Sequence, residues 1–152
     1  MTPRADVSLA SSEIDAFLNE PRTAVLSTLG PTGAPHMAAM WFVVKDDAIE
    51  MWTYAKSQKA VNARRDPRVA VLIEEGIAYN ELRGVLVKGI AEVIEDLAAV
   101  VDIGRRLYEC YTLPRTQVPV EAAMPEIERQ GRKRIGIRLA MRDVASWDHS
   151  KL

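Results

Sequence analysis

The alternation of apolar and polar residues predicts that the first third of this chain is built mainly from β-strands. Three segments, Thr23–Leu29, Pro35–Val44 and Ala48–Tyr54, are rich in apolar and β-favouring side chains, and short turn-like segments separate them. Strands joined by such short turns pair with antiparallel neighbours. We therefore expect these three strands to form an antiparallel meander.

Further strands are predicted later in the chain. The apolar run Val69–Glu74 suits a buried strand, and Glu81–Glu95 follows as one long strand or two bent segments. Gly84 and Gly89 within the second segment permit the sharp bending that a barrel requires. The alternation in Lys133–Val144 is the clearest in the sequence and predicts the last strand.

Helices are predicted from capping residues and apolar faces. Ser12–Asn19 begins with a sequence that resembles a capping box. A short helix begins after Ser57, a good N-cap, and ends at Asp66-Pro67. The third helix, Leu97–Tyr111, has one continuous apolar face.

The remaining segment has the weakest pattern. Thr112–Pro125 contains three prolines and is predicted to be a loop, while Glu126–Gln130 adds a helical turn. Parallel βαβ units would need helices between most strands, and these are missing. We therefore predict one domain over residues 1–152 that is mainly β, a six-stranded antiparallel barrel with flanking helices.

Composition and charge narrow the function classes. The chain is 48% hydrophobic and 27% charged, as in ordinary soluble domains, and its net charge of −1 gives no reason to expect nucleic acid as a partner. Cys110 stands alone, which excludes an intrachain disulfide and a cysteine-based metal site. The sequence has no signal-peptide core and no run of about 18 apolar residues, so we expect a cytoplasmic protein that does not enter membranes.

The sequence gives little evidence of a hydrolase site or of a nucleotide-binding motif. His36 and His149 are the only histidines, and neither lies in a nucleophile elbow or a metal-ligand spacing. No glycine-rich phosphate loop is present. We therefore assign no catalytic residue and no metal site.

The start of the helix after Ser57 has the composition of an anion site. Lys56 and Lys59 flank a helix N-terminus, where the macrodipole disfavours cations unless a ligand brings negative charge. A phosphate group would be held there by backbone N–H groups, hydroxyls and lysine charge. The nearby polar side chains are Thr53, Tyr54, Gln58 and Asn62. The alternative is a capped helix with two solvated lysines, and the sequence alone leaves both open.

The second predicted strand is rich in large, flat or pliable side chains: Met37, Met40, Trp41 and Phe42. These residues form either part of the core or a wall against a planar heteroaromatic ring. A ring platform beside a phosphate site indicates a phosphorylated aromatic cofactor. Flavin mononucleotide (FMN) and its deazaflavin counterpart both have this chemistry.

With these features the sequence resembles the pyridoxamine-phosphate-oxidase-like split-barrel superfamily, and more closely the B group of flavin/deazaflavin oxidoreductases. The resemblance rests on Pro31–Glu74, where SQKAVN is followed by DPRVAVL, and on the ending SWDHSKL. It covers nearly the whole chain and is weakest over Thr112–Arg132. The chain lacks the additional arginine and lysine pattern of true pyridoxamine-phosphate oxidases, which argues against the vitamin-salvage reaction.

The resemblance implies a six-stranded split barrel that forms a homodimer with cofactor sites at the subunit interface. It implies phosphate binding at Thr53, Ser57, Gln58 and Lys59, with Asn62 supporting the helix and Lys56 next to the motif. It also implies that Ala39, Met40 and Trp41 edge the ring, and that the other subunit contributes the region of Tyr79.

The function implied by the resemblance is that of an oxidoreductase dependent on coenzyme F420, the deazaflavin cofactor. Hydride would pass from the reduced cofactor to a small conjugated or aromatic substrate. One alternative is an FMN-dependent reductase or oxidase of the same fold. A second is a carrier that binds flavin, haem or tetrapyrrole without turnover.

Overall fold

Nine strands form two antiparallel sheets within residues 7–152, the part of the chain that the computed structural model describes. Residues 1–6, which the predicted single domain includes, lie outside the described residues. The first sheet has the order β2 (Pro35–Met40), β1 (Ala24–Leu29), β5 (Arg68–Glu75), β6 (Arg83–Ile90) and β9 (Asp143–Asp148). The second has the order β3 (Val43–Lys45), β4 (Ala48–Tyr54), β8 (Arg134–Ala140) and β7 (Glu92–Ile94).

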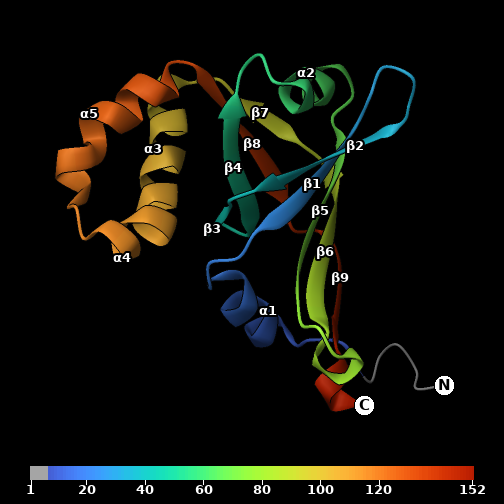
Figure 1. The fold of residues 1–152 in the computed structure, drawn as a ribbon. Helices are drawn as coiled ribbons and strands as arrows, with labels where there is room; N and C mark the ends of the chain where they lie inside the picture. The colour runs from blue at the N-terminus through green and yellow to red at the C-terminus, as the bar shows by residue number, and fades with distance from the viewer. Residues whose placement is uncertain (1–6) are drawn as a thin grey trace.

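The helices lie around these sheets (Figure 1). They are α1 (Ser11–Leu18), α2 (Gln58–Arg65), α3 (Leu97–Leu107), α4 (Leu113–Thr116) and α5 (Val120–Gly131). A π-helical turn, Tyr108–Thr112, joins α3 to α4, and short 3-10 turns cover Tyr79–Glu81 and His149–Lys151. Figure 1 shows α3, α4 and α5 together on one flank, beside β4, with α2 at the end of that strand. None of the helices in residues 7–152 has both the length and the apolar character to cross a membrane.

The core lies between the two sheets and is made of alternate residues from their facing sides. Leu26, Val71 and Val85 come from the first sheet, and Met51 and Ile137 come from the second. Strand β1 alternates between buried and partly buried positions, as a strand with one core face should. Strand β4 is buried along most of its length, because α3 covers its other face.

The predicted fold class, a mainly β antiparallel fold with flanking helices, is confirmed, although the strands are nine rather than six. Each predicted strand exists, but three of them are broken into two, and for Glu81–Glu95 two bent segments were one of the two alternatives predicted. The breaks fall at Trp41-Phe42, at Ala91 and at Met141-Arg142. At each break the chain passes from one sheet to the other, which the period of the side chains does not reveal.

The predicted three-strand meander is wrong in part. Strands β1 and β2 pair in antiparallel fashion, from Ala24 opposite Met40 to Leu29 opposite Pro35. Strand β4 pairs instead with β3 and β8, in the other sheet. The chain therefore leaves the first sheet after Met40, and this exit places the end of β2 next to β4 at the edge of a cavity.

Two local predictions about helices are also corrected. The first helix is capped two residues earlier than predicted, at Ala10, where the Glu13 carboxylate accepts a hydrogen bond from the Ala10 N–H at 2.6 Å. The predicted loop Thr112–Pro125 is mostly helical, and α5 includes Pro125 in its interior. Packing explains this second result, since Ile127 and Gly131 of α5 are buried and the helix lies against α3.

Candidate functional site

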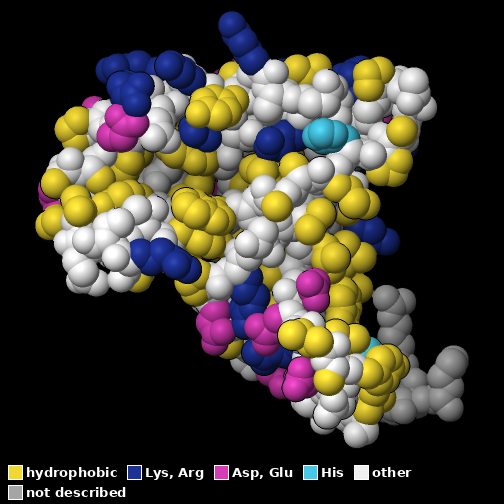
Figure 2. Space-filling model, viewed as in Figure 1, with side chains coloured by type: hydrophobic (Ala, Val, Ile, Leu, Met, Phe, Trp, Pro, Cys, Tyr) yellow, Lys and Arg dark blue, Asp and Glu magenta, His cyan; other side chains and the backbone are white. Residues whose placement is uncertain are grey.

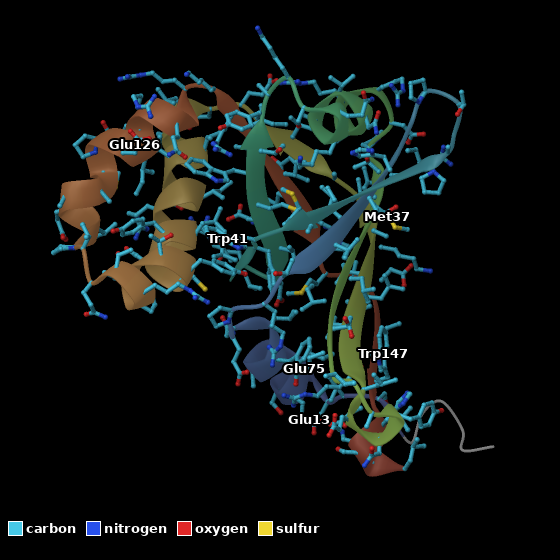
Figure 3. All side chains as sticks on the ribbon, viewed as in Figure 1. Glu13, Met37, Trp41, Glu75, Glu126 and Trp147 are labelled. Atoms are coloured by element: carbon cyan, nitrogen blue, oxygen red, sulfur yellow. The ribbon has the colours of Figure 1, made fainter. Side chains whose placement is uncertain are left out.

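A cavity of about 610 Å³ opens between the ends of β2 and β4 and the helices α3 and α5. Its size and its mixed apolar and polar lining are typical of a small-molecule site. In Figure 3, Trp41 lies between the strands and α3, and Glu126 lies on α5. The lining residues from the strands and α2 are Ala39, Met40, Trp41, Trp52, Thr53, Tyr54, Lys59 and Arg134. Those from the helical side are Gly104, Leu107, Tyr108, Thr112, Ala123, Glu126, Ile127 and Gln130.

Six of the residues predicted from the sequence line this one cavity: Ala39, Met40, Trp41, Thr53, Tyr54 and Lys59. The first three come from the segment predicted to hold a ring, and the last three from the segment predicted to hold a phosphate. The fold therefore brings the two segments together. Their contacts with a cofactor stay a prediction.

The start of α2 has the local structure expected of an anion site. Ser57 is the N-cap, and its hydroxyl accepts a hydrogen bond from the Ala60 N–H at 3.3 Å. The same oxygen lies 3.2 Å from Oγ1 of Thr53, a residue that is only 4% exposed. The N–H groups of Gln58 and Lys59 lie in the first turn, where no intrahelical carbonyl is available to them.

Lys59 brings an uncompensated charge to this helix start. It is half-buried in the cavity wall, and no carboxylate in residues 7–152 forms an ion pair with it. Lys56 also has no ion pair in that range, but it is exposed and does not line the cavity. Free amide hydrogens beside an unpaired ammonium group are what a phosphate requires. The residues present therefore fit a phosphorylated cofactor.

Two of the predicted residues support α2 from behind. Asn62 is completely buried, and its amide donates to the hydroxyl of Thr28 in β1 at 3.0 Å. The Gln58 side chain donates to Asn62 Oδ1 at 2.7 Å, and neither residue lines the cavity. These hydrogen bonds fix the position of the helix, so both side chains act on a ligand through Lys59 and the backbone.

Tyr79 lies outside the cavity of its own chain. It is 70% exposed, its ring lies 4.6 Å from the ring of His149, and its carbonyl oxygen is 2.9 Å from His149 Nδ1. The resemblance assigns this region to the cofactor site of the other subunit. That assignment stays a prediction.

Trp41 is held as a fixed platform although it is 50% exposed. Its ring stacks on Tyr111 with 4.7 Å between centroids and 5° between planes. The Tyr111 hydroxyl donates a hydrogen bond to the carbonyl oxygen of Arg22 at 2.7 Å, which holds the stack against the segment that joins α1 to β1. Burial raises the pKa of Tyr111, so this donor stays protonated.

The helical wall of the cavity was missed by sequence reasoning, because most of α5 was predicted to be a loop. One signal was present in the sequence. Gly104 lies on the apolar face of α3, where an added Cβ would overlap the Trp52 ring. An isolated glycine inside a helical pattern often has a packing reason, and here that reason is the close approach of Trp52.

Comparison with known proteins gives consistent matches. The family model described as pyridoxamine 5'-phosphate oxidase matches residues 10–147. A Mycobacterium tuberculosis (strain CDC 1551 / Oshkosh) protein named F420H(2)-dependent biliverdin reductase is 35% identical over 121 residues, 78% of this chain and 85% of that protein.

Two solved structures are similar in fold. The crystal structure of the conserved hypothetical protein Rv2991 from Mycobacterium tuberculosis is 44% identical, with a TM-score of 0.89, and covers 99% of this chain and 92% of that chain. A structure named F420 reductase is 23% identical, with a TM-score of 0.65, over 86% of this chain and 94% of that one.

Proposed function

This chain belongs to the pyridoxamine 5'-phosphate oxidase family, and from that premise we propose that it is an oxidoreductase that uses coenzyme F420. The observation that carries the proposal is that Lys59, at the start of α2, lines the same cavity as Met40 and Trp41. The relative named as an F420H(2)-dependent reductase favours the deazaflavin cofactor over FMN.

In this proposal the two ends of the cavity have different tasks. The N–H groups at the start of α2, the Thr53 and Ser57 hydroxyls and the Lys59 ammonium hold the phosphate. The edge of β2, from Ala39 to Trp41, lies along the ring. When bound, coenzyme F420 supplies two-electron hydride chemistry at its planar ring.

The protein contributes orientation and exclusion of water. The Trp41–Tyr111 stack fixes one wall, and Leu107 and Ile127 provide apolar surface from α3 and α5. A small conjugated or aromatic substrate enters the space beside the ring and is held there at the distance needed for transfer. No side chain of the cavity is assigned as a proton donor.

Absorbance spectroscopy separates the proposal from its alternatives. Protein that takes up coenzyme F420 and oxidises its reduced form in the presence of a conjugated acceptor supports the proposal. Protein that is isolated yellow with FMN, and that uses FMN in the same assay, would assign the site to FMN. Tight binding of either cofactor without turnover over a panel of enones and tetrapyrroles would indicate a carrier.

The phosphate assignment is tested by Lys59→Ala. Loss of one charge-assisted hydrogen bond corresponds to about 1.5–3 kcal/mol, so we expect the Kd for coenzyme F420 to rise about 10- to 100-fold in a fluorescence titration. Combining it with Ser57→Ala should weaken binding further, with an added loss of about 1 kcal/mol in stability from the helix cap.

Lys56→Ala is the matched control for this test. It removes the same charge from an exposed side chain three residues away, outside the cavity, and should leave the Kd nearly unchanged. No loss for Lys59→Ala would show that the phosphate lies elsewhere, and equal losses for the two variants would show that Lys56 also contacts it.

A further inference from the structure

Among the partly buried arginines of residues 7–152, Arg134 differs from the others in forming no ion pair. The others each lie within ion-pair distance of at least one carboxylate: Arg22, Arg83, Arg105, Arg106 and Arg138. Arg134 has no carboxylate partner in this range. A guanidinium that is partly removed from water and left without a counter-charge is unfavourable unless something else compensates it.

Two aromatic rings hold the Arg134 guanidinium in place. Its Cζ atom lies 4.7 Å from the centre of the Trp52 ring and 4.1 Å from that of Tyr54. Stacking of this kind orients a planar guanidinium but provides no hydrogen-bond acceptor. All three residues line the cavity, so the fixed group belongs to its wall.

Most of the hydrogen-bonding capacity of Arg134 is not used by residues 7–152. Its Nη2 donates to Gln130 Oε1 at 3.3 Å, and its Nε is buried with no partner in the described part of the chain. Burial lowers the pKa of Arg134, as expected where no carboxylate opposes it. An arginine has five N–H donors, and a flat fork of this type is suited to a carboxylate.

The acidic residue of the cavity lining does not serve as this partner. The carboxylate of Glu126 accepts from Arg129 at 2.7 and 2.5 Å and from Gln130 Nε2 at 2.9 Å. Gln130 therefore bridges Glu126 and Arg134 through its amide. Arg129 also lowers the pKa of Glu126 to about 2, so this acid stays ionised and paired.

Arg134 comes from a different element of the cavity wall than Lys59. It is the first residue of β8, directly opposite Tyr54 in the β4–β8 register, and it is adjacent to the end of α5. Lys59 comes from α2. Within residues 7–152 the cavity wall thus contains two cations without carboxylate partners, and the proposed function assigns the cofactor phosphate to Lys59.

We propose that Arg134 binds a carboxylate group of the substrate, so that the cavity selects conjugated molecules that carry a negative charge. The assignment of this carboxylate to a substrate rests on the proposed function. The same chemistry could come from a carboxylate of the cofactor itself, and the experiment below separates these two sources.

The test compares biliverdin with biliverdin dimethyl ester, an acid and a neutral ester with the same conjugated system. Quenching of tryptophan fluorescence gives a Kd for each, since Trp41 and Trp52 line the cavity. We expect the wild-type protein to bind the acid more tightly, and Arg134→Gln to reduce that preference about 10- to 100-fold. Arg134→Lys, which keeps the charge and loses the planar fork, should retain part of it.

Arg132→Gln is the matched control, because it removes the same charge from an exposed side chain two residues away. It should leave the acid-to-ester ratio unchanged. If Arg134→Gln does not fold, as judged by circular dichroism, Arg134→Met removes the same charge and keeps an unbranched side chain against Trp52 and Tyr54. A preference for the acid that survives unchanged in the folded neutral variant would overturn the proposal.

Titrations with coenzyme F420 and FMN identify the source of the carboxylate. FMN has a phosphate but no carboxylate, whereas coenzyme F420 has both. If Arg134→Gln weakens binding of coenzyme F420 alone, the carboxylate belongs to the cofactor, and the substrate assignment is wrong. The acid-to-ester ratio is also measured without cofactor, so failure of the proposed function would not be confused with failure of this inference.

Discussion

For Asn62, the sequence predicted that the residue lies near the start of the helix but did not predict which way its side chain points. The spacing of Ser57, Lys59 and Asn62 places all three near the start of a short helix, and this was evident from the sequence. Lys59 lines the cavity, whereas Asn62 is completely buried against β1. The difference depends on β1, which is about thirty residues earlier in the chain, so no local pattern contains it.

We predict that Asn62→Ala destabilises the protein by about 1–3 kcal/mol, because the buried Thr28 hydroxyl loses its partner. Urea denaturation measures the change. Thr28→Val is the companion variant, and adding it to Asn62→Ala should cost less than it costs alone, since no unpaired hydroxyl remains. Strictly additive losses would mean that the hydrogen bond contributes nothing.

At the level of elements, the sequence predicted where strands occur but not where they change sheets. All six predicted strands are present, because burial of one face imposes a period of two. The break at Trp41-Phe42 has no marker such as proline or glycine, whereas the break at Ala91 follows Gly89, in a segment predicted as one long strand or two bent segments. Because the first of these breaks is unmarked, the predicted meander failed, although the β1–β2 hairpin was correct.

The helical wall could not be predicted for a different reason. Pro125 normally argues against a helix interior, since it removes an N–H group and crowds the preceding turn. Here the burial of Ile127 and Gly131 against α3 outweighs that preference. The sequence therefore predicted the part of the candidate site that lies on the strands and α2, and it did not predict the part that lies on α3 and α5.

An ion network fixes α3 on the second sheet and with it the position of this wall. Glu50 of β4 is only 5% exposed and pairs with Arg106 of α3 and, at 3.1 Å, with Arg138 of β8. Asp102 adds a second carboxylate to Arg106 at 2.9 Å. Burial alone would raise the pKa of Asp102, but hydrogen bonds from Arg105 and Arg106 lower it to about 2.

We predict that Glu50→Gln destabilises the protein by about 3 kcal/mol. This lies at the lower end of the range for breaking a buried ion pair, because Arg106 keeps Asp102. Glu92→Gln is the control: its side chain is 70% exposed and lies 3.9 Å from the same Arg138, so its effect should stay within about 0.5 kcal/mol. Equal effects in thermal or urea denaturation would contradict the importance of burial at Glu50.

On the scale of the whole molecule, the distribution of exposed apolar side chains is uneven. Met37 of β2 is 66% exposed and Ile90 of β6 is 64% exposed, both in the first sheet. Ile77, between β5 and β6, is 97% exposed. Figure 2 shows hydrophobic side chains along the flank formed by this sheet, away from α3 and α5, and Figure 3 places Met37 there. Apolar surface of this kind is typical of an interaction site.

We predict that the protein is a homodimer that uses this flank. Light scattering should give twice the mass of one chain, and the melting temperature should rise with protein concentration because association stabilises the folded state. Met37→Asp should shift the mass toward that of a monomer, since it would bury an unpaired charge in the interface. Val118→Asp, at a 43% exposed site on the opposite, helical side, is the control and should leave the mass unchanged.

This prediction also decides how many chains make one site. Ala39 lies two residues from Met37 on the same exposed face of β2, and it lines the cavity. A second subunit placed against that face would lie next to the cavity opening, where its Tyr79 could reach the cofactor. Tyr79→Ala should then weaken cofactor binding in the dimer, while His149→Ala, which removes the neighbouring ring and its contact with the Tyr79 carbonyl oxygen but keeps the Tyr79 side chain, should weaken it less. A monomer that binds cofactor with wild-type affinity would exclude Tyr79 from the site and leave the cavity of a single chain as the complete one.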